Sequence, residues 1–247
     1  MPKNFEQEAQ ELLKIFTKLK SGLSSEIFAR TKQKFHRPFV IEITGTPDSG
    51  KTSVINTLTR FFKRAGWRVL NPAEGAEIIK KVPRTTYLYN IRTGIYALAE
   101  LLDNTYSLDF DLIIFDRAVY DAYCWQEYWL RKKIISPEVA EFNQKFFVQS
   151  EIANKVDICF FVICQAEEAM RREAKWALTE KHGETTNPET IQNLVEIWQD
   201  CFKKLQENKA PIILMDTTKM SPKQMGRFIL YHTLKVILKR LKNLKQS

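Results

Sequence analysis

The residues with the clearest chemical use form a glycine-rich octamer, GTPDSGKT, which runs from Gly45 to Thr52. It fits the pattern GxxxxGK followed by Ser or Thr, with a strand-like apolar run before it and a helical pattern after it, as a phosphate-binding loop requires. Glycines let the backbone turn its N–H groups onto phosphate oxygens, and a helix starting near Lys51 points its positive end at the same anion. The octamer therefore predicts a nucleotide phosphate site.

Individual side chains of this loop have separate expected roles. Lys51 is expected to reach the β- and γ-phosphates, and the Thr52 hydroxyl is expected to bind Mg²⁺. A second metal ligand is predicted at Asp116, which ends the apolar run LIIF, where a carboxylate would face the phosphates. Alternatively, Asp116 caps the helix that follows it, and one carboxylate can do both. The predicted nucleotide-binding residues are Gly45, Thr46, Asp48, Ser49, Gly50, Lys51, Thr52 and Ser53.

Beyond the loop, the chain resembles the nucleoside and nucleotide monophosphate kinases, particularly the thymidylate kinase and deoxynucleoside kinase branch. The resemblance rests on the phosphate loop, on a second apolar run that ends near a glutamate, and on the pair Asp116-Arg117. It extends from about Phe39 to the helix after PIILMD. It implies that Arg117 lies near the transferred phosphoryl group or the acceptor. It also implies that Glu74, or as a second candidate Glu77, positions or deprotonates the acceptor.

A cationic lid is the next implication of this resemblance, at about residues 165–190. Arg171, Arg172 and Lys175 match its position, and Arg171 and Lys175 share a helix face because they are four residues apart. A closing cationic lid would stabilise the charge that develops on the transferred oxygens, and it would exclude water. The alternative is a basic helix that is simply solvated.

Aromatic residues are concentrated where an acceptor would bind, in VPRTTYLYNIRTGIYALAE and RAVYDAYCWQEYW. Flat rings can stack on a nucleobase, and arginines can hold a phosphate group bidentately. Most of these aromatic side chains are expected to belong to the core. The predicted acceptor-binding residues are Arg84, Tyr87, Arg92 and Trp125.

The nature of the acceptor stays open at this stage. Thymidylate kinases usually carry Arg-Glu-Pro where this chain has Asn-Pro-Ala-Glu, and deoxynucleoside kinases usually carry Glu-Arg-Ser where it has Asp-Arg-Ala. The leading prediction is an ATP-dependent phosphotransferase that acts on a nucleoside or nucleotide. One alternative is a polynucleotide 5′-end kinase of the same fold, and another is a nucleotide-dependent regulatory ATPase or switch.

A scaffold that brings strand ends together is needed to position these residues. Five apolar runs, FVIEIT, WRVL, DLIIFD, DICFFVI and PIILMD, alternate with stretches of helical periodicity. Strands that are buried on both faces and separated by helices predict an α/β fold, with a central five-stranded parallel sheet between two helical layers, as in P-loop NTPases. Residues 1–37 are predicted to form a helical extension, and residues 38–247 a single kinase-like domain.

Composition limits the class of protein. The chain has 247 residues, of which 44% are apolar and 27% charged, and this usage is typical of a globular protein rather than a disordered one. Charges interrupt every apolar run before it could span a membrane, and the N-terminus does not read as a secretory signal. Four cysteines without a CxxC pair predict buried free thiols in a reducing compartment. We therefore predict a cytoplasmic protein, and a homodimer is possible.

Most of the net charge of +9 comes from one C-terminal segment. Residues 221–247 contain seven lysines and arginines and no carboxylate, and their apolar positions recur at helical spacing. The segment therefore predicts an amphipathic helix with a basic outer face. Such a face is most often solvated, although it can also bind nucleic acid or an acidic membrane surface.

Overall fold

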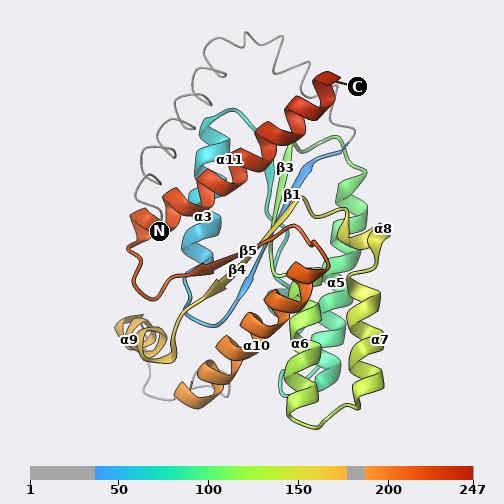
Figure 1. The fold of residues 1–247 in the computed structure, drawn as a ribbon, viewed down its shortest axis with the longest axis vertical. Helices are drawn as coiled ribbons and strands as arrows, with labels where there is room; N and C mark the ends of the chain where they lie inside the picture. Colours follow the sequence, from blue (N-terminus) through green and yellow to red (C-terminus); the bar gives the residue numbers. More distant parts are fainter. Residues whose placement is uncertain (1–36, 177–186, 247) are drawn as a thin grey trace.

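The computed structural model describes residues 37–176 and 187–246 (Figure 1). The predicted N-terminal helical extension and part of the predicted lid lie outside these residues. The strands are β1 (Phe39–Gly45), β2 (Val69–Leu70), β3 (Leu112–Asp116), β4 (Ile158–Ile163) and β5 (Ile212–Asp216). The helices are α3 (Lys51–Arg64), α4 (Gly75–Ile78), α5 (Tyr87–Thr105), α6 (Val119–Arg131), α7 (Pro137–Phe147), α8 (Ser150–Ala153), α9 (Ala166–Trp176), α10 (Pro188–Glu207) and α11 (Pro222–Gln246).

The five strands form one parallel sheet in the order β2-β3-β1-β4-β5. In this register Ile43 of β1 lies beside Asp116 of β3, and Ile163 of β4 lies beside Asp216 of β5. The carboxyl ends of the strands therefore meet at one edge, which is where ligands bind in open parallel sheets. The predicted fold class is confirmed.

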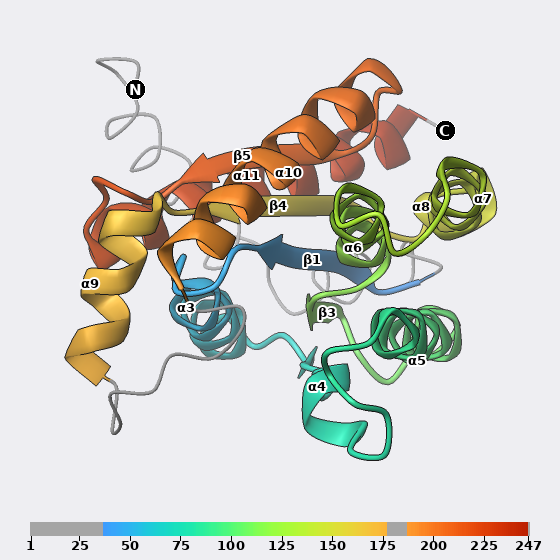
Figure 2. The same cartoon turned by 90° about the horizontal axis from the view of Figure 1, so that it is seen from below.

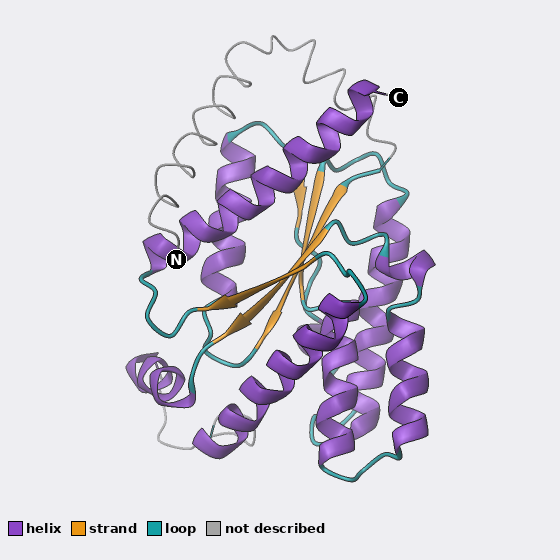
Figure 3. Ribbon diagram, viewed as in Figure 1, coloured by secondary structure: helices purple, strands orange, loops and turns teal. Residues whose placement is uncertain are grey.

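Two helical layers cover the sheet, because alternate residues of each buried strand point to opposite faces. Ile41 and Ile43 of β1 pack on one side with apolar residues of α3 and α11. Val40 of the same strand packs on the other side with residues of α5, α6 and α10. Figures 1 and 3 show this division, with the strands fanning out between the two groups of helices. Figure 2 shows that α7 packs outside α6, at a distance from the sheet.

A buried carboxylate from β1 organises the start of α6. Glu42 is fully buried, and its side chain accepts hydrogen bonds from the backbone N–H groups of Ala118 (2.9 Å), Tyr120 (3.1 Å) and Asp121 (2.8 Å). Burial raises the pKa of Glu42 to about 7, although the three N–H donors oppose this shift. Glu42 therefore caps the N-terminus of α6. The alternative role predicted for Asp116, as the cap of this helix, is thus taken by Glu42.

Replacing Glu42 by alanine is expected to lower the free energy of unfolding by about 3 kcal/mol, since three buried N–H groups would lose their acceptor. Urea unfolding of the wild type and the variant at pH 7 measures this difference. Glu42→Gln serves as the matched control, because it keeps one acceptor oxygen and should lose less. A Glu42→Ala protein as stable as the wild type would show that water replaces the carboxylate.

The predicted C-terminal helix is present as α11. Its apolar residues pack against the same face of the sheet as those of α3. The side chains of Lys223, Lys235 and Lys239 are exposed. Near its far end, Arg240 forms an ion pair with Asp157 (2.8 Å), which also pairs with Arg37. The helix is therefore an integral layer of the fold with a basic outer face, and nucleic acid as its partner stays a prediction.

Two further expectations concern cysteines and membrane helices. The four cysteines are free and buried, as predicted. Over residues 37–176 and 187–246, none of the helices combines the length and the apolar character that a bilayer crossing needs.

Candidate functional site

The backbone of the predicted phosphate loop requires glycine at both of its ends. Gly45 has φ 150°, and a Cβ atom there would lie 1.8 Å from the carbonyl oxygen of Val162. Gly50 has φ 93°, and a Cβ atom there would lie 2.4 Å from a side-chain atom of Met225. Gly45 is thus required by the close approach of the Val162 backbone, and Gly50 by its left-handed conformation. The loop joins β1 to α3 at the carboxyl edge of the sheet.

Inside the loop the polar side chains bind the loop's own backbone. The hydroxyl of Ser49 and the Nζ of Lys51 both donate to the carbonyl oxygen of Thr46, at 2.8 and 2.7 Å. Asp48 has φ 51°. Burial and the neighbouring Glu173 carboxylate raise the pKa of Asp48 to about 6. The remaining predicted residues, Thr52 and Ser53, lie exposed in the first turn of α3.

Lys51 is a half-buried cation whose pKa is lower than that of an ordinary lysine. Burial, and then the nearby Arg117, lower the pKa of Lys51 to about 8, although Asp116 and other carboxylates oppose this shift. At pH 7 the ammonium group is therefore still charged and can bind an anion. Phosphate groups beside it would raise its pKa again.

Nucleotide binding is accordingly expected to take up protons. ADP should bind with an uptake of roughly half a proton or more near pH 8.5, and its affinity should fall as the pH rises through about 8. Calorimetry in two buffers with different ionisation enthalpies measures this uptake. Lys51→Arg is the matched control, because arginine stays charged and should abolish the uptake. Equal uptake in both proteins would assign the proton to another group.

Asp116 at the end of β3 has the properties of a metal ligand. Its Oδ1 atom is buried and has no hydrogen-bond partner among the described residues. Burial raises the pKa of Asp116, although Arg117 and Lys51 oppose this shift. A buried unpaired oxygen needs a polar partner, and Mg²⁺ commonly takes one or two protein oxygens together with waters and phosphates. Asp116 and the Thr52 hydroxyl are oxygens of the required kind, so these residues fit a magnesium ion.

Arg117 links the phosphate loop to a neighbouring cavity. Its Nε donates to Glu74 (3.0 Å), and its Nη1 donates to Asp121 (2.8 Å) and to the carbonyl oxygen of Gly45 (3.4 Å). The residue has φ 66°, which is uncommon for a side chain of this size and is typical of functional sites. Its backbone N–H still donates to the carbonyl of Ile43. The strained backbone therefore aims a charged group at the point where the loop meets the cavity.

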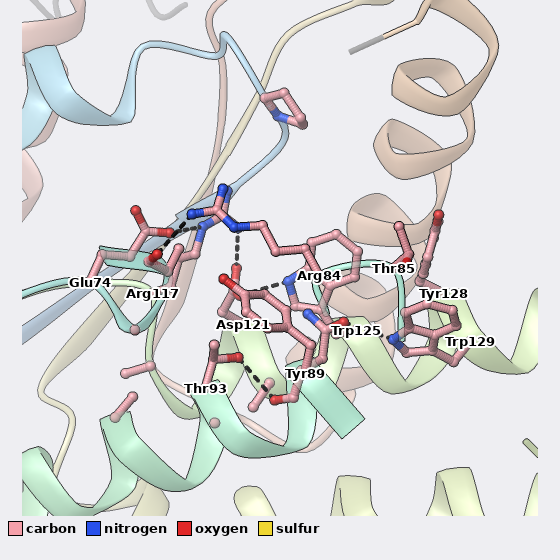
Figure 4. Close-up of a pocket in the computed structure, with 18 residues that line it drawn as sticks. Glu74, Arg84, Thr85, Tyr89, Thr93, Arg117, Asp121, Trp125, Tyr128 and Trp129 are labelled. Atoms are coloured by element: carbon pink, nitrogen blue, oxygen red, sulfur yellow. Dashed lines mark hydrogen bonds and ion pairs between the residues drawn. The ribbon is translucent and has the colours of Figure 1, made fainter. Parts of the chain in front are cut away.

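The cavity has a volume of about 210 Å³ and lies against α4, α5 and α6 (Figure 4). Glu74 and Arg117 lie at one side of it and Tyr128 and Trp129 at the other (Figure 4). Pro47 of the phosphate loop is also part of its wall. Burial raises the pKa of Glu74, although Arg117 opposes this shift. The cavity is thus continuous with the predicted nucleotide site and carries a carboxylate at that end.

Of the predicted acceptor-binding residues, Arg84 and Trp125 line the cavity, whereas Tyr87 and Arg92 do not. The Tyr87 ring packs edge-on against Trp129, and its hydroxyl accepts a hydrogen bond from Asn143. Arg92 is exposed on the outer side of α5. Two of the four predicted acceptor-binding residues therefore line the cavity.

Asp121 is a central residue of the site that the sequence analysis missed. Its carboxylate accepts from Thr44 (2.6 Å), from Arg117 (2.8 Å) and from the indole N–H of Trp125 (2.8 Å). The Thr44 hydroxyl in turn accepts from the indole of Trp198. Part of the signal was present, because Asp121 and Trp125 are four residues apart and share a face of α6, whereas Arg117 lies just before that helix. Asp121 thereby fixes both the arginine and the aromatic wall.

The arginines predicted for the lid behave differently. Arg172 donates to the backbone carbonyls of Thr217 (2.7 Å) and Asp48 (3.3 Å), so it joins α9 to the phosphate loop. Arg171 is 71% exposed at its side chain and pairs with Glu168. The side chain of Lys175 and the segment 177–186 lie outside the described residues. Of the two arginines, Arg172 therefore lies beside the predicted nucleotide site and Arg171 is exposed.

Comparisons with known proteins bear on the fold. No family model matches the chain, and no curated protein matches its sequence. Among solved structures, deoxyadenosine kinase from M. mycoides with bound dATP matches with a TM-score of 0.53 and 16% identity, over 83% of this chain and 100% of that chain. The same enzyme with bound dCTP matches with a TM-score of 0.50 and 18% identity over the same shares. At this identity the likeness shows a shared fold alone.

Proposed function

We propose that the protein transfers the γ-phosphoryl group of ATP to a hydroxyl group of a nucleoside-sized acceptor. The observation that carries this proposal is the position of Arg117, whose guanidinium contacts both the phosphate loop, at Gly45, and the acceptor cavity, at Glu74. An acceptor in that cavity would present its hydroxyl to the end of a bound nucleotide. The likeness in fold to deoxyadenosine kinases supports the same reaction.

The charges of the cavity favour a neutral hydroxyl over a phosphate group as the acceptor. Its charged lining residues within the described chain are two carboxylates, Glu74 and Asp121, and two arginines, Arg84 and Arg117. Arg117 is already bound by both carboxylates, and Arg84 is exposed and donates to the carbonyl of Ala76. A phosphate acceptor would need free cations, whereas a hydroxyl needs a base within hydrogen-bond reach. Glu74 meets that second requirement.

In the proposed reaction, Glu74 accepts the proton of the acceptor hydroxyl as its oxygen bonds to the γ-phosphorus and the bond to ADP breaks. Lys51, Arg117 and Arg172 would stabilise the charge on the transferred oxygens. Magnesium, held by Thr52 and Asp116, would supply further neutralisation of the phosphate charge. The raised pKa of Glu74 suits this role, because a general base is most effective when its pKa lies near the working pH.

Both alternatives receive less support. The basic face of α11 lies on the α3 side of the sheet, whereas the cavity lies against α5 and α6 on the other side. A polynucleotide end in the cavity would therefore not follow that face. A cavity of about 210 Å³ is also smaller than the roughly 300–1,000 Å³ of common ligand pockets, which suits one small acceptor. A switch protein requires no such cavity beside its nucleotide.

ADP release in the presence of Mg-ATP tests the proposal. The purified protein is assayed alone and with pooled nucleosides, nucleoside monophosphates or 5′-hydroxyl oligonucleotides, with Lys51→Ala as the blank. A nucleoside pool that raises turnover well above the rate without acceptor is the expected result. Stimulation by monophosphates alone, or by oligonucleotides alone, would show that the acceptor belongs to that class and is not a nucleoside. Slow Lys51-dependent hydrolysis that no pool stimulates would favour the switch.

A further inference from the structure

A buried amide in the wall of the cavity has a fixed orientation. Asn90 in the first turn of α5 is 7% exposed and lines the cavity. Its Oδ1 accepts a hydrogen bond from the indole Nε1 of Trp129 at 2.9 Å. An indole N–H can only donate, so the atom of Asn90 that faces Trp129 must be the oxygen. Trp129 therefore decides which way round the amide lies.

The consequence is that the oxygen of the Asn90 amide is held at Trp129, so the amide nitrogen is the end that is directed elsewhere. Its amide nitrogen carries two N–H groups, and these have no hydrogen-bond partner in the part of the chain that the structure describes. A ligand that displaces solvent from these N–H groups is favoured when it supplies an acceptor, whereas a ligand that places a donor there leaves both donors unpaired. An asparagine that was free to turn could satisfy either kind of ligand.

We propose that the cavity selects acceptors whose base carries a carbonyl oxygen, rather than an amino group, at the exocyclic position read by Asn90. This inference rests on the proposed function and names its substrate class. Uracil, thymine, hypoxanthine and guanine carry a carbonyl at that position, whereas cytosine and adenine carry an amino group there. A site built to hydrogen-bond one group rejects the analogue that cannot complete the bond.

The aromatic lining is compatible with a base at this place. Trp125 and Tyr128 line the cavity with Trp129, and the Trp125 indole is held by Asp121 and packs edge-on against Trp198. These contacts fix the rings, so a flat ligand meets a rigid wall. Tyr89 lines the same cavity, and its buried hydroxyl has no partner within the described residues. A polar ligand that enters the cavity would satisfy this hydroxyl as well as the amide.

Matched nucleosides test the selectivity. We expect kcat/KM for uridine to exceed that for cytidine, and that for inosine to exceed that for adenosine, by about ten-fold or more. Asn90→Asp, assayed at pH 8 to keep the carboxylate ionised, still accepts from Trp129 and now presents an acceptor, so the preference should reverse. Trp129→Phe keeps an aromatic ring but releases Asn90, so both ratios should fall towards one. The thermal stability and ADP affinity of each variant serve as controls.

Binding of the same four nucleosides, measured by calorimetry in the presence of ADP, separates this inference from the proposed reaction. A preference for uridine and inosine in binding without any turnover would support the selectivity and overturn the kinase proposal. Turnover with equal kcat/KM within each pair, or with a preference for the amino bases, would overturn the selectivity alone. Ratios that Trp129→Phe leaves unchanged would also overturn it, since the amide would then not depend on that tryptophan.

Discussion

Replacing Glu74 by glutamine is expected to lower kcat by about 10²- to 10⁴-fold, which is the usual contribution of a positioned general base. The amide keeps an oxygen that can accept from Arg117 Nε, so the geometry of the arginine should persist. It cannot take a proton from the acceptor hydroxyl. Nucleotide affinity should change little, because the nucleotide does not depend on this group. Steady-state kinetics and ADP titration of the same preparation measure both quantities.

The pH dependence gives a second readout of the same change. Burial raises the pKa of Glu74, so the acid limb of the wild-type profile should lie above the ordinary value of a glutamate, with the rate rising as the carboxyl loses its proton. The Glu74→Gln protein should lack this limb. Glu77→Gln is the matched control, because Glu77 is three residues away, exposed and outside the cavity lining. Equal losses in the two variants, or an unchanged acid limb, would remove Glu74 from the chemistry.

The nucleotide end of the site was predictable because its determinants are local in the sequence. Gly45 and Gly50 are required by the backbone within one loop, and Lys51 follows directly as the helix begins. The sheet was predictable for a similar reason, since each apolar run became a strand, although WRVL contributes only the two residues Val69–Leu70. The segments between the apolar runs are long enough, and helical enough in pattern, to form the helical crossovers that parallel strands need.

The cavity was less predictable because its contacts join distant segments. Asp121 binds Thr44 across 77 residues, and Trp129 binds Asn90 across 39 residues. Helical periodicity says which residues share a face, but it does not say what that face meets. Arg92 was predicted for the pocket and is exposed, whereas Asn90, two residues before it, lines the cavity. Two residues turn a helix by about 200°, so a choice made by residue type alone selects the wrong face.

These two halves of the site differ in what they recognise. A phosphate loop binds phosphate with backbone N–H groups, and the conformation this needs restricts its sequence. The loop can therefore be recognised from the sequence alone. The proposed acceptor half would bind with side chains whose orientation is set by partners such as Trp129 and Asp121. Changes in those partners would alter the acceptor without changing the motif. A fold shared with deoxyadenosine kinases at 16% identity is therefore compatible with a different acceptor.

Replacing Arg117 by lysine is expected to lower kcat/KM by about 10²- to 10³-fold, although the positive charge is kept. One ammonium group cannot reproduce the planar fork that contacts Glu74, Asp121 and the carbonyl of Gly45 together. Either Glu74 or Asp121 would then lose its ion pair, and the transferred phosphoryl group would lose a fixed donor. Kinetics with the acceptor identified by the ADP-release assay measure the loss.

Arg84→Lys is the matched control for Arg117→Lys, because Arg84 also lines the cavity but is exposed and, among the described residues, donates only to the carbonyl of Ala76. Its replacement should cost less than about ten-fold in kcat/KM, since a surface hydrogen bond of this kind stabilises little. Thermal unfolding of both variants separates a loss of the site from a loss of the fold. An Arg117→Lys enzyme that stays folded and keeps more than about a tenth of the activity would mean that charge alone suffices, and that the fork at Arg117 has a structural role only.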